Sequence, residues 1–127
     1  MIVVKENIIQ EKSFKFAIRI INCYRYLIDV KKEYILSKQI LRSGTSIGAN
    51  VEEAIGGQSE KDFVNKISIA YKESRETNYW LKLLKETNFI DTKMLTSINN
   101  DCEEIIKIIT SIQKTIKSNI NNKISNL

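Results

Sequence analysis

Carboxylate side chains are the groups in this chain whose number and spacing most directly suggest catalysis. Glutamates on facing turns of helices can hold a magnesium ion for nucleotide hydrolysis. Glu73 and Glu76 share one helical face, but Arg42, Lys72 and Arg75 are available to pair with them. Ion pairing and solvation therefore explain these acids more simply than a metal site does. The six candidate acids are Glu52, Glu53, Glu73, Glu76, Glu103 and Glu104.

Other common catalytic groups are missing from the sequence. The chain has no histidine, which removes the commonest general base and the histidine ligand of di-iron helical bundles. Cys23 and Cys102 are too few for a zinc site and do not form a CxxC pair, so we interpret them as small buried side chains rather than a disulfide. We expect no catalytic residue, no cofactor, no metal and no small-molecule substrate.

The composition predicts a helical protein with one domain, residues 1–127. The chain is 43% hydrophobic and contains no proline and only four glycines, a poor supply of turns for a sheet. Mainly apolar residues recur every three or four positions, as on one face of a helix. These stripes are, in chain order, Phe16, Ile20, Cys23, Leu27 and Val30; Leu36, Ile40, Ser43, Ile47, Asn50 and Ala54; Phe63, Ile67, Ala70, Ser74, Thr77, Leu81 and Leu84; and Leu95, Ile98, Cys102, Ile105, Ile109, Ile112 and Ile116. Short links between such helices favour a left-handed antiparallel four-helix bundle of up-down-up-down order, with flexible termini. The predicted helices cover about 13–30, 33–54, 59–85 and 92–118.

Three local signals define the expected helix boundaries. Ser59 stands three residues before Asp62, which is typical of a helix start whose hydroxyl caps a backbone amide. The last helix should be capped by Asp91 or Thr92. Gly56-Gly57 should end the second helix, because glycine readily adopts the left-handed conformation.

Small residues dominate the second predicted helix between Arg42 and Glu53. Gly44 and Gly48 lie four residues apart, so they share a face that lets another backbone approach closely, and Ser46 adds further small volume. Each glycine costs about 1 kcal/mol relative to alanine in a helix, which predicts tight packing within the bundle or between subunits. Asn50 falls on the apolar stripe, where its amide must find a hydrogen bond.

Two further features predict contacts with partners. Tyr79-Trp80 places two rings about 100° apart on a helix, so one is expected at or outside the edge of the core, as an interface anchor. Residues 105–127 carry four lysines and no acid, which makes Lys107, Lys114 and Lys117 candidate nucleic-acid contacts. The alternative is that these lysines only solvate the surface.

The stretches Leu36–Ala54 and Ser59–Leu84 resemble the bacterial four-helix-bundle proteins encoded in intervening sequences of 23S ribosomal RNA genes. The family pattern Q-x-x-R-x-x-x-S-x-x-x-N-x-x-E is matched by residues along the second predicted helix. One departure is that many members have glycine where this chain has Ala54, which displaces the turn to Gly56-Gly57. The matching residues are Gln39, Arg42, Ser46, Asn50 and Glu53.

The resemblance implies a homo-oligomeric ring, typically of five subunits. Related accessory proteins of diversity-generating retroelements bind nucleic acid and the reverse transcriptase, which makes RNA or DNA the expected partner. No catalytic residue is implied. The alternative is a purely structural or protein-binding module. With no signal-peptide pattern and no long apolar stretch, the sequence favours a cytoplasmic protein without a membrane partner.

Overall fold

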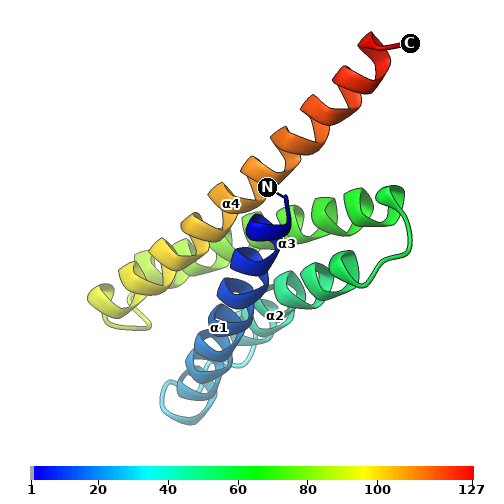
Figure 1. The fold of residues 1–127 in the computed structure, drawn as a ribbon. Helices are drawn as coiled ribbons and strands as arrows, with labels where there is room; N and C mark the ends of the chain where they lie inside the picture. Colours follow the sequence, from blue (N-terminus) through cyan, green and yellow to red (C-terminus); the bar gives the residue numbers. More distant parts are fainter. Residues whose placement is uncertain (1) are drawn as a thin grey trace.

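Four helices form the fold in a computed structural model that describes the backbone of residues 2–127 and the side chains from residue 7 onward (Figure 1). No strand occurs within residues 2–127, which confirms the prediction of an all-α protein. The helices are α1 (Ile2–Asp29), α2 (Leu36–Ile55), α3 (Glu60–Glu86) and α4 (Thr92–Ser125).

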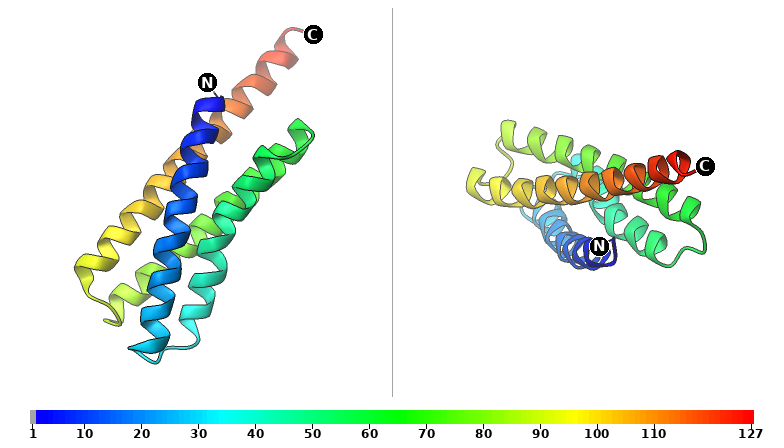
Figure 2. Two further views of the ribbon diagram at one scale, coloured as in Figure 1. Left: turned by 60° about the horizontal axis from the view of Figure 1, so that its bottom comes forward. Right: turned by 45° about the horizontal axis from the view of Figure 1, so that its top comes forward.

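Each helix packs against its neighbours along the chain, and α1 also packs against α4. Figure 2 shows the α1–α2 and α3–α4 connections at one end of the molecule and the α2–α3 connection at the other. The last turns of α4 extend past the ends of the other three helices (Figures 1 and 2). This overhang leaves part of α4 without a helix beside it.

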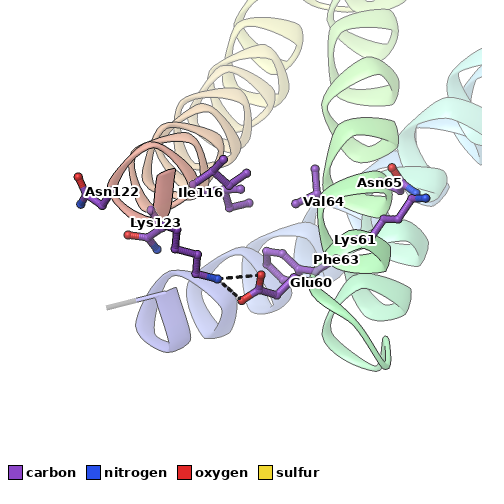
Figure 3. A pocket seen from close by; sticks show the side chains of 10 residues that line it. Glu60, Lys61, Phe63, Val64, Asn65, Ile116, Asn122 and Lys123 are labelled. Carbon is purple, nitrogen blue, oxygen red and sulfur yellow. Dashed lines mark hydrogen bonds and ion pairs between the residues drawn. The ribbon is translucent and has the colours of Figure 1, made fainter. Parts of the chain in front are cut away.

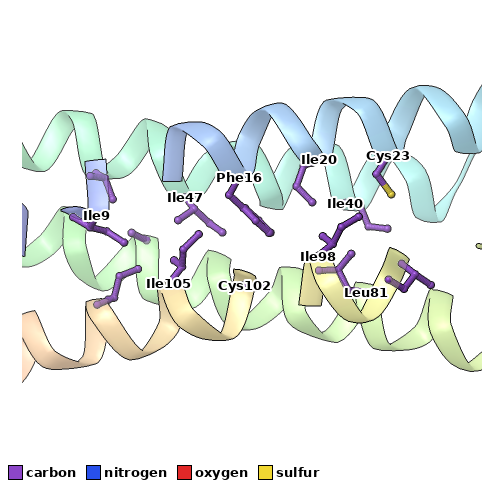
Figure 4. Close-up of a cluster of buried hydrophobic side chains, with 14 of the residues drawn as sticks. Ile9, Phe16, Ile20, Cys23, Ile40, Ile47, Leu81, Ile98, Cys102 and Ile105 are labelled. Atoms are coloured by element: carbon purple, nitrogen blue, oxygen red, sulfur yellow. The ribbon is translucent and has the colours of Figure 1, made fainter. Parts of the chain in front are cut away.

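The predicted apolar stripes form one shared core (Figure 4). The α4 stripe from Leu95 to Ile112 is buried at every predicted position. In α1 the predicted positions from Phe16 to Leu27 are buried as well, while Val30, just beyond the helix, is 60% exposed. A period of three and four residues therefore identified the inward faces correctly.

The first and last helices are longer than predicted. α1 begins at Ile2 rather than near residue 13, because Ile9 extends the buried stripe of that helix by two turns. Ser13 is buried within the helix, and its hydroxyl donates to the Gln10 carbonyl at 3.2 Å instead of capping a start. α4 continues to Ser125, seven residues past the predicted end. Its sequence there contains neither glycine nor proline to stop it.

The second helix begins at Leu36, and Glu33 lies outside it as a cap. The Glu33 carboxylate accepts hydrogen bonds from the backbone N–H groups of Ile35, Leu36 and Ser37, at 2.7–3.2 Å. Partial burial raises the pKa of this carboxyl, but the three N–H donors outweigh that effect and hold its pKa below the ordinary value. The prediction that Glu33 is helical was therefore wrong by one turn.

The predicted N-terminal caps of α3 and α4 are confirmed, whereas the predicted end of α2 is only partly right. Ser59 accepts from the Asp62 N–H at 3.1 Å, and Asp91, the first of the two candidates, accepts from the Lys93 N–H at 3.0 Å. Gly56-Gly57 does follow α2, but neither glycine has a positive φ, so the predicted left-handed stop is wrong. The constraint on Gly57 is steric instead, because a β-carbon there would lie 3.2 Å from the Ala54 carbonyl oxygen.

Candidate functional site

A polar cluster lies where α2 faces α3, and Arg42 is at its centre. The guanidinium Nη1 is 3.3 Å from the Glu73 carboxylate, and Nη2 contacts the Glu76 carboxylate. The Trp80 indole N–H donates to the same Glu76 oxygen at 2.9 Å. Because one guanidinium is shared by both acids, the cluster is suited to joining two helices rather than to proton transfer.

Gln39 of the family pattern precedes Arg42 and accepts from its guanidinium at 3.4 Å, and Ser46 and Glu53 follow Arg42 along α2. The Ser46 hydroxyl donates to the Arg42 carbonyl at 2.6 Å, and the Glu53 carboxylate lies 3.4 Å from the Lys66 ammonium of α3. The pattern therefore places two cross-helix ion pairs, three turns apart, along one edge of the α2–α3 contact. Arg42 and Glu53 therefore join α2 to α3 by ion pairs, whereas Ser46 bonds within α2.

Asn50 differs from the sequence prediction. It is half-buried rather than in the core, and its amide makes the hydrogen bond it needs within α2, by donating to the Ser46 carbonyl at 2.8 Å. The next residue, Val51, takes the core position and is fully buried. The helical rotation of 100° per residue places Asn50 beside the core, where water can share its amide.

The glycines of α2 face α1. A β-carbon on Gly44 would lie 2.8 Å from two side-chain carbons of Ile20, and one on Gly48 would lie 3.3 Å from the Ser13 carbonyl oxygen. Both positions therefore permit α1 to approach α2 more closely than a larger residue would allow. The close packing expected at this pair is found within the chain.

Tyr79 and Trp80 differ in how much of each side chain is exposed to solvent. Trp80 is half-buried and packs against the core, whereas Tyr79 is 56% exposed. Their rings contact each other edge to face, with 5.1 Å between centroids. Of the pair, Tyr79 is the side chain left available to a partner.

The six glutamates considered for magnesium binding do not form one cluster. No group of three or more His, Cys, Asp or Glu side chains that could hold a metal ion occurs among the described residues. Each candidate acid instead contacts a polar or basic side chain. Besides the pairs above, Glu52 accepts from Gln10, Glu103 accepts from Asn99, and Glu104 lies 2.5 Å from Lys12.

The cations of α1 and α4 differ in their partners. Arg19 and Lys12 of α1 pair with Asp101 and Glu104 of α4, so the acids of α4 neutralise the face that α1 turns toward it. Lys107, Lys114 and Lys117 are all exposed, and none pairs with a carboxylate among residues 7–127. The three predicted lysines of α4 are therefore accessible and carry charge that no acid in the described residues neutralises.

Both cysteines are free and buried, as the sequence predicted. Burial raises the pKa of the Cys23 thiol to about 11 and that of Cys102 to about 12. The Cys102 thiol donates to the Ser74 carbonyl at 3.3 Å. Because a thiolate is the nucleophilic form, neither group is suited to covalent catalysis.

One polar pair in the core was missed by sequence reasoning. The hydroxyls of Ser43 in α2 and Thr77 in α3 lie 2.9 Å apart, and both residues are fully buried. Each falls on a predicted apolar stripe, so a buried hydroxyl on two stripes was the available signal. Each hydroxyl also lies within hydrogen-bond distance of a carbonyl of its own helix, that of Gln39 for Ser43 and that of Glu73 for Thr77, so the pair adds a polar contact between α2 and α3.

Comparisons with known proteins give the family. The model of the 23S rRNA-intervening sequence protein family matches residues 5–111. A crystal structure from Bacteroides thetaiotaomicron, described as a protein of unknown function from the S23 ribosomal protein family, is 54% identical, with a TM-score of 0.84. The alignment covers 87% of this chain and 98% of that one. No curated protein matches the chain.

None of the helices in the described part of the chain is both long enough and apolar enough to span a membrane. The fold, the polar pattern along α2 and both matches agree with one another. The chain belongs to the 23S rRNA-intervening sequence protein family.

Proposed function

We propose that this chain is a non-catalytic scaffold that assembles with copies of itself into a ring and binds RNA or DNA weakly through α4. Each subunit is one domain, residues 1–127, folded as a left-handed antiparallel bundle of up-down-up-down order. The cyclic order of helix contacts and the short connections support this topology. The two free thiols suit the reducing cytoplasm.

The main support for self-assembly is that large apolar side chains are exposed at helical spacing. Phe14 and Ile18 stand four residues apart on α1 and are 65% and 47% exposed. Tyr79 of α3 is exposed to a similar degree. Large apolar side chains exposed in this way are typical of an interface, because burying them removes the cost of hydrating them. The subunit number of five comes from the family resemblance.

The proposal that the chain is not a catalyst is supported by the contacts of the six candidate glutamates. Glu73 and Glu76 share Arg42, and the other candidate glutamates contact neighbouring polar or basic groups. A magnesium site needs several carboxylates that face one another, and these glutamates instead bond to other side chains at separate places. The rival function is a nucleotide hydrolase, which predicts turnover that disappears in Glu73→Gln.

Nucleic-acid binding is supported by the lysines of α4. Lys107 and Lys114 are seven residues apart, so they project from the same face about 10 Å apart along the helix axis. A ring of five would repeat this face around its axis, and five chains of charge +5 would present about +25 to a polyanion. Binding of this kind depends strongly on salt and weakly on sequence, because it is driven by counterion release.

The test is a titration of labelled single- and double-stranded RNA and DNA at about 50 and 200 mM salt, with counterion release predicting a steep loss of affinity. The triple variant Lys107→Gln, Lys114→Gln, Lys117→Gln should bind much more weakly than the wild type at low salt. The matched control replaces Lys12, Lys15 and Lys66, which are paired with acids. Wild-type protein that fails to bind at low salt would leave the purely structural or protein-binding module.

A further inference from the structure

The outward side of α3 carries cations both before and after its exposed tyrosine, Tyr79. The cations are Lys72, Arg75 and Lys82, at seven and four residues before the tyrosine and at three residues after it. These spacings place all of them on the same side of the helix, over about 15 Å of its length. All three are exposed, and none pairs with a carboxylate among residues 7–127. An aromatic ring therefore lies within a row of positive charges that no acid neutralises.

The glutamates nearest to this row in the sequence leave it positive. The Glu76 carboxylate contacts the Arg42 guanidinium of α2, so its charge is already balanced. Glu86 continues the row, but it is the last residue of α3 and stands seven residues past Tyr79. A surface with this balance attracts a polyanion such as a chain of phosphates.

Trp80 holds the Tyr79 ring in place. The two rings meet edge to face, with 5.1 Å between centroids, and the indole N–H is fixed in turn by the Glu76 carboxylate at 2.9 Å. An edge-to-face contact covers at most one face of the tyrosine ring, and Tyr79 is 56% exposed. The second face is therefore open to a flat partner such as a nucleic-acid base.

The neighbours of Tyr79 distinguish this surface from the apolar pair on α1. Phe14 and Ile18 stand one helical turn apart, whereas the residues about one turn before and after Tyr79 are Arg75 and Lys82. Burying unpaired cations between two copies of the chain would remove their hydration without supplying a partner. Phosphate groups supply that partner as charged hydrogen-bond acceptors.

We infer that this side of α3 binds single-stranded RNA or DNA, with a base stacked on Tyr79 and phosphates at Lys72, Arg75 and Lys82. Cations combined with an open aromatic ring are the usual means of binding single strands without sequence preference. In a duplex the bases already stack on one another, so this surface should prefer single strands. The inference rests on the proposed nucleic-acid binding and adds a contact with bases to the phosphate contacts of the α4 lysines.

An abasic strand separates stacking from charge, because it has the phosphates of oligo-dT without the bases. At about 50 mM salt, where phosphate contacts are strong, Tyr79→Ala should bind labelled oligo-dT at least about five-fold more weakly than the wild type. Tyr79→Phe should bind like the wild type, because it keeps the ring. Neither variant should change binding of the abasic strand, whereas the variant Lys72→Gln, Arg75→Gln, Lys82→Gln should weaken binding of both strands.

The matched control is Tyr34→Ala, which removes a tyrosine that is 53% exposed in the connection between α1 and α2 and should leave binding unchanged. Tyr79→Ala that binds oligo-dT as tightly as the wild type would overturn the stacking site and leave the α4 lysines as the binding surface. Tyr79→Ala that becomes a monomer in light scattering would place this tyrosine between copies of the chain and overturn the site as well. Wild-type protein that binds neither strand would overturn the proposed nucleic-acid binding altogether.

Discussion

Gly44 of α2 faces Ile20 of α1 so closely that a β-carbon on Gly44 would lie 2.8 Å from both γ-carbons of the isoleucine. Ile20 is fully buried and branched at its β-carbon, so it cannot turn aside without disturbing the core. The contact sets the distance between these two helices.

Gly44→Ala should therefore lower the free energy of unfolding, although alanine favours a helix. Overpacking costs about 1–3 kcal/mol, and the gain in helix propensity offsets about 1 kcal/mol of it. Urea unfolding should show a net loss. Gly56→Ala is the control, because a β-carbon there meets only the Glu52 carbonyl at an ordinary 3.4 Å. A Gly44→Ala variant more stable than the wild type would contradict the close approach.

Glu76→Ala should shift the fluorescence of Trp80, the single tryptophan of the chain. The indole N–H loses its carboxylate acceptor and becomes hydrated, which should move the emission to longer wavelength. Glu73→Ala is the matched control, since Glu73 contacts Arg42 but not the indole. The two ion pairs are partly exposed, so each variant should cost no more than about 1 kcal/mol. An identical spectrum for Glu76→Ala would contradict the hydrogen bond.

The stability of the chain should fall in acid partly through Glu33. Its pKa is lower in the folded protein than in the unfolded chain, so its contribution is present above the unfolded value of about 4.3 and is lost as the pH falls below it. Glu33→Gln should lower the stability at pH 7 by about 1 kcal/mol, the usual value of a helix cap. The wild type and the variant should converge once the pH has fallen below the folded pKa of Glu33. Parallel pH curves would show that Glu33 does not cap α2.

Both thiols should resist alkylation in the native protein. At pH 8 almost none of either thiol is ionised when the pKa is about 11 for Cys23 and about 12 for Cys102. Iodoacetamide should modify both after unfolding in urea, with mass spectrometry as the readout. Rapid modification of either residue in the folded chain would contradict its burial.

Much of the fold follows from local periodicity in the sequence. The stripes of α3 and α4 predicted the buried faces because the helical repeat fixes which residues share a side. The same repeat placed Gly44 and Gly48 on one face but did not identify α1 as their neighbour. Which helix lies opposite depends on tertiary packing, and no spacing within α2 contains that information.

Two errors in the predicted helix boundaries have a common physical cause. Ser13 and Glu33 are residues that favour helix ends, yet Ser13 lies inside α1 and Glu33 lies outside α2. A side chain able to bond the backbone serves either position, so residue type alone does not distinguish them. The apolar groove between the start of α3 and the end of α4 (Figure 3) was not predicted either, because its walls come from segments more than 50 residues apart.

The mass of the wild-type particle in solution tests the central claim most directly. Size-exclusion chromatography with light scattering should give five chains of 14.7 kDa each at micromolar concentration. The variant Phe14→Asn, Ile18→Asn, which removes the exposed apolar side chains of α1, should give a single chain. A wild-type particle of 14.7 kDa would contradict the account.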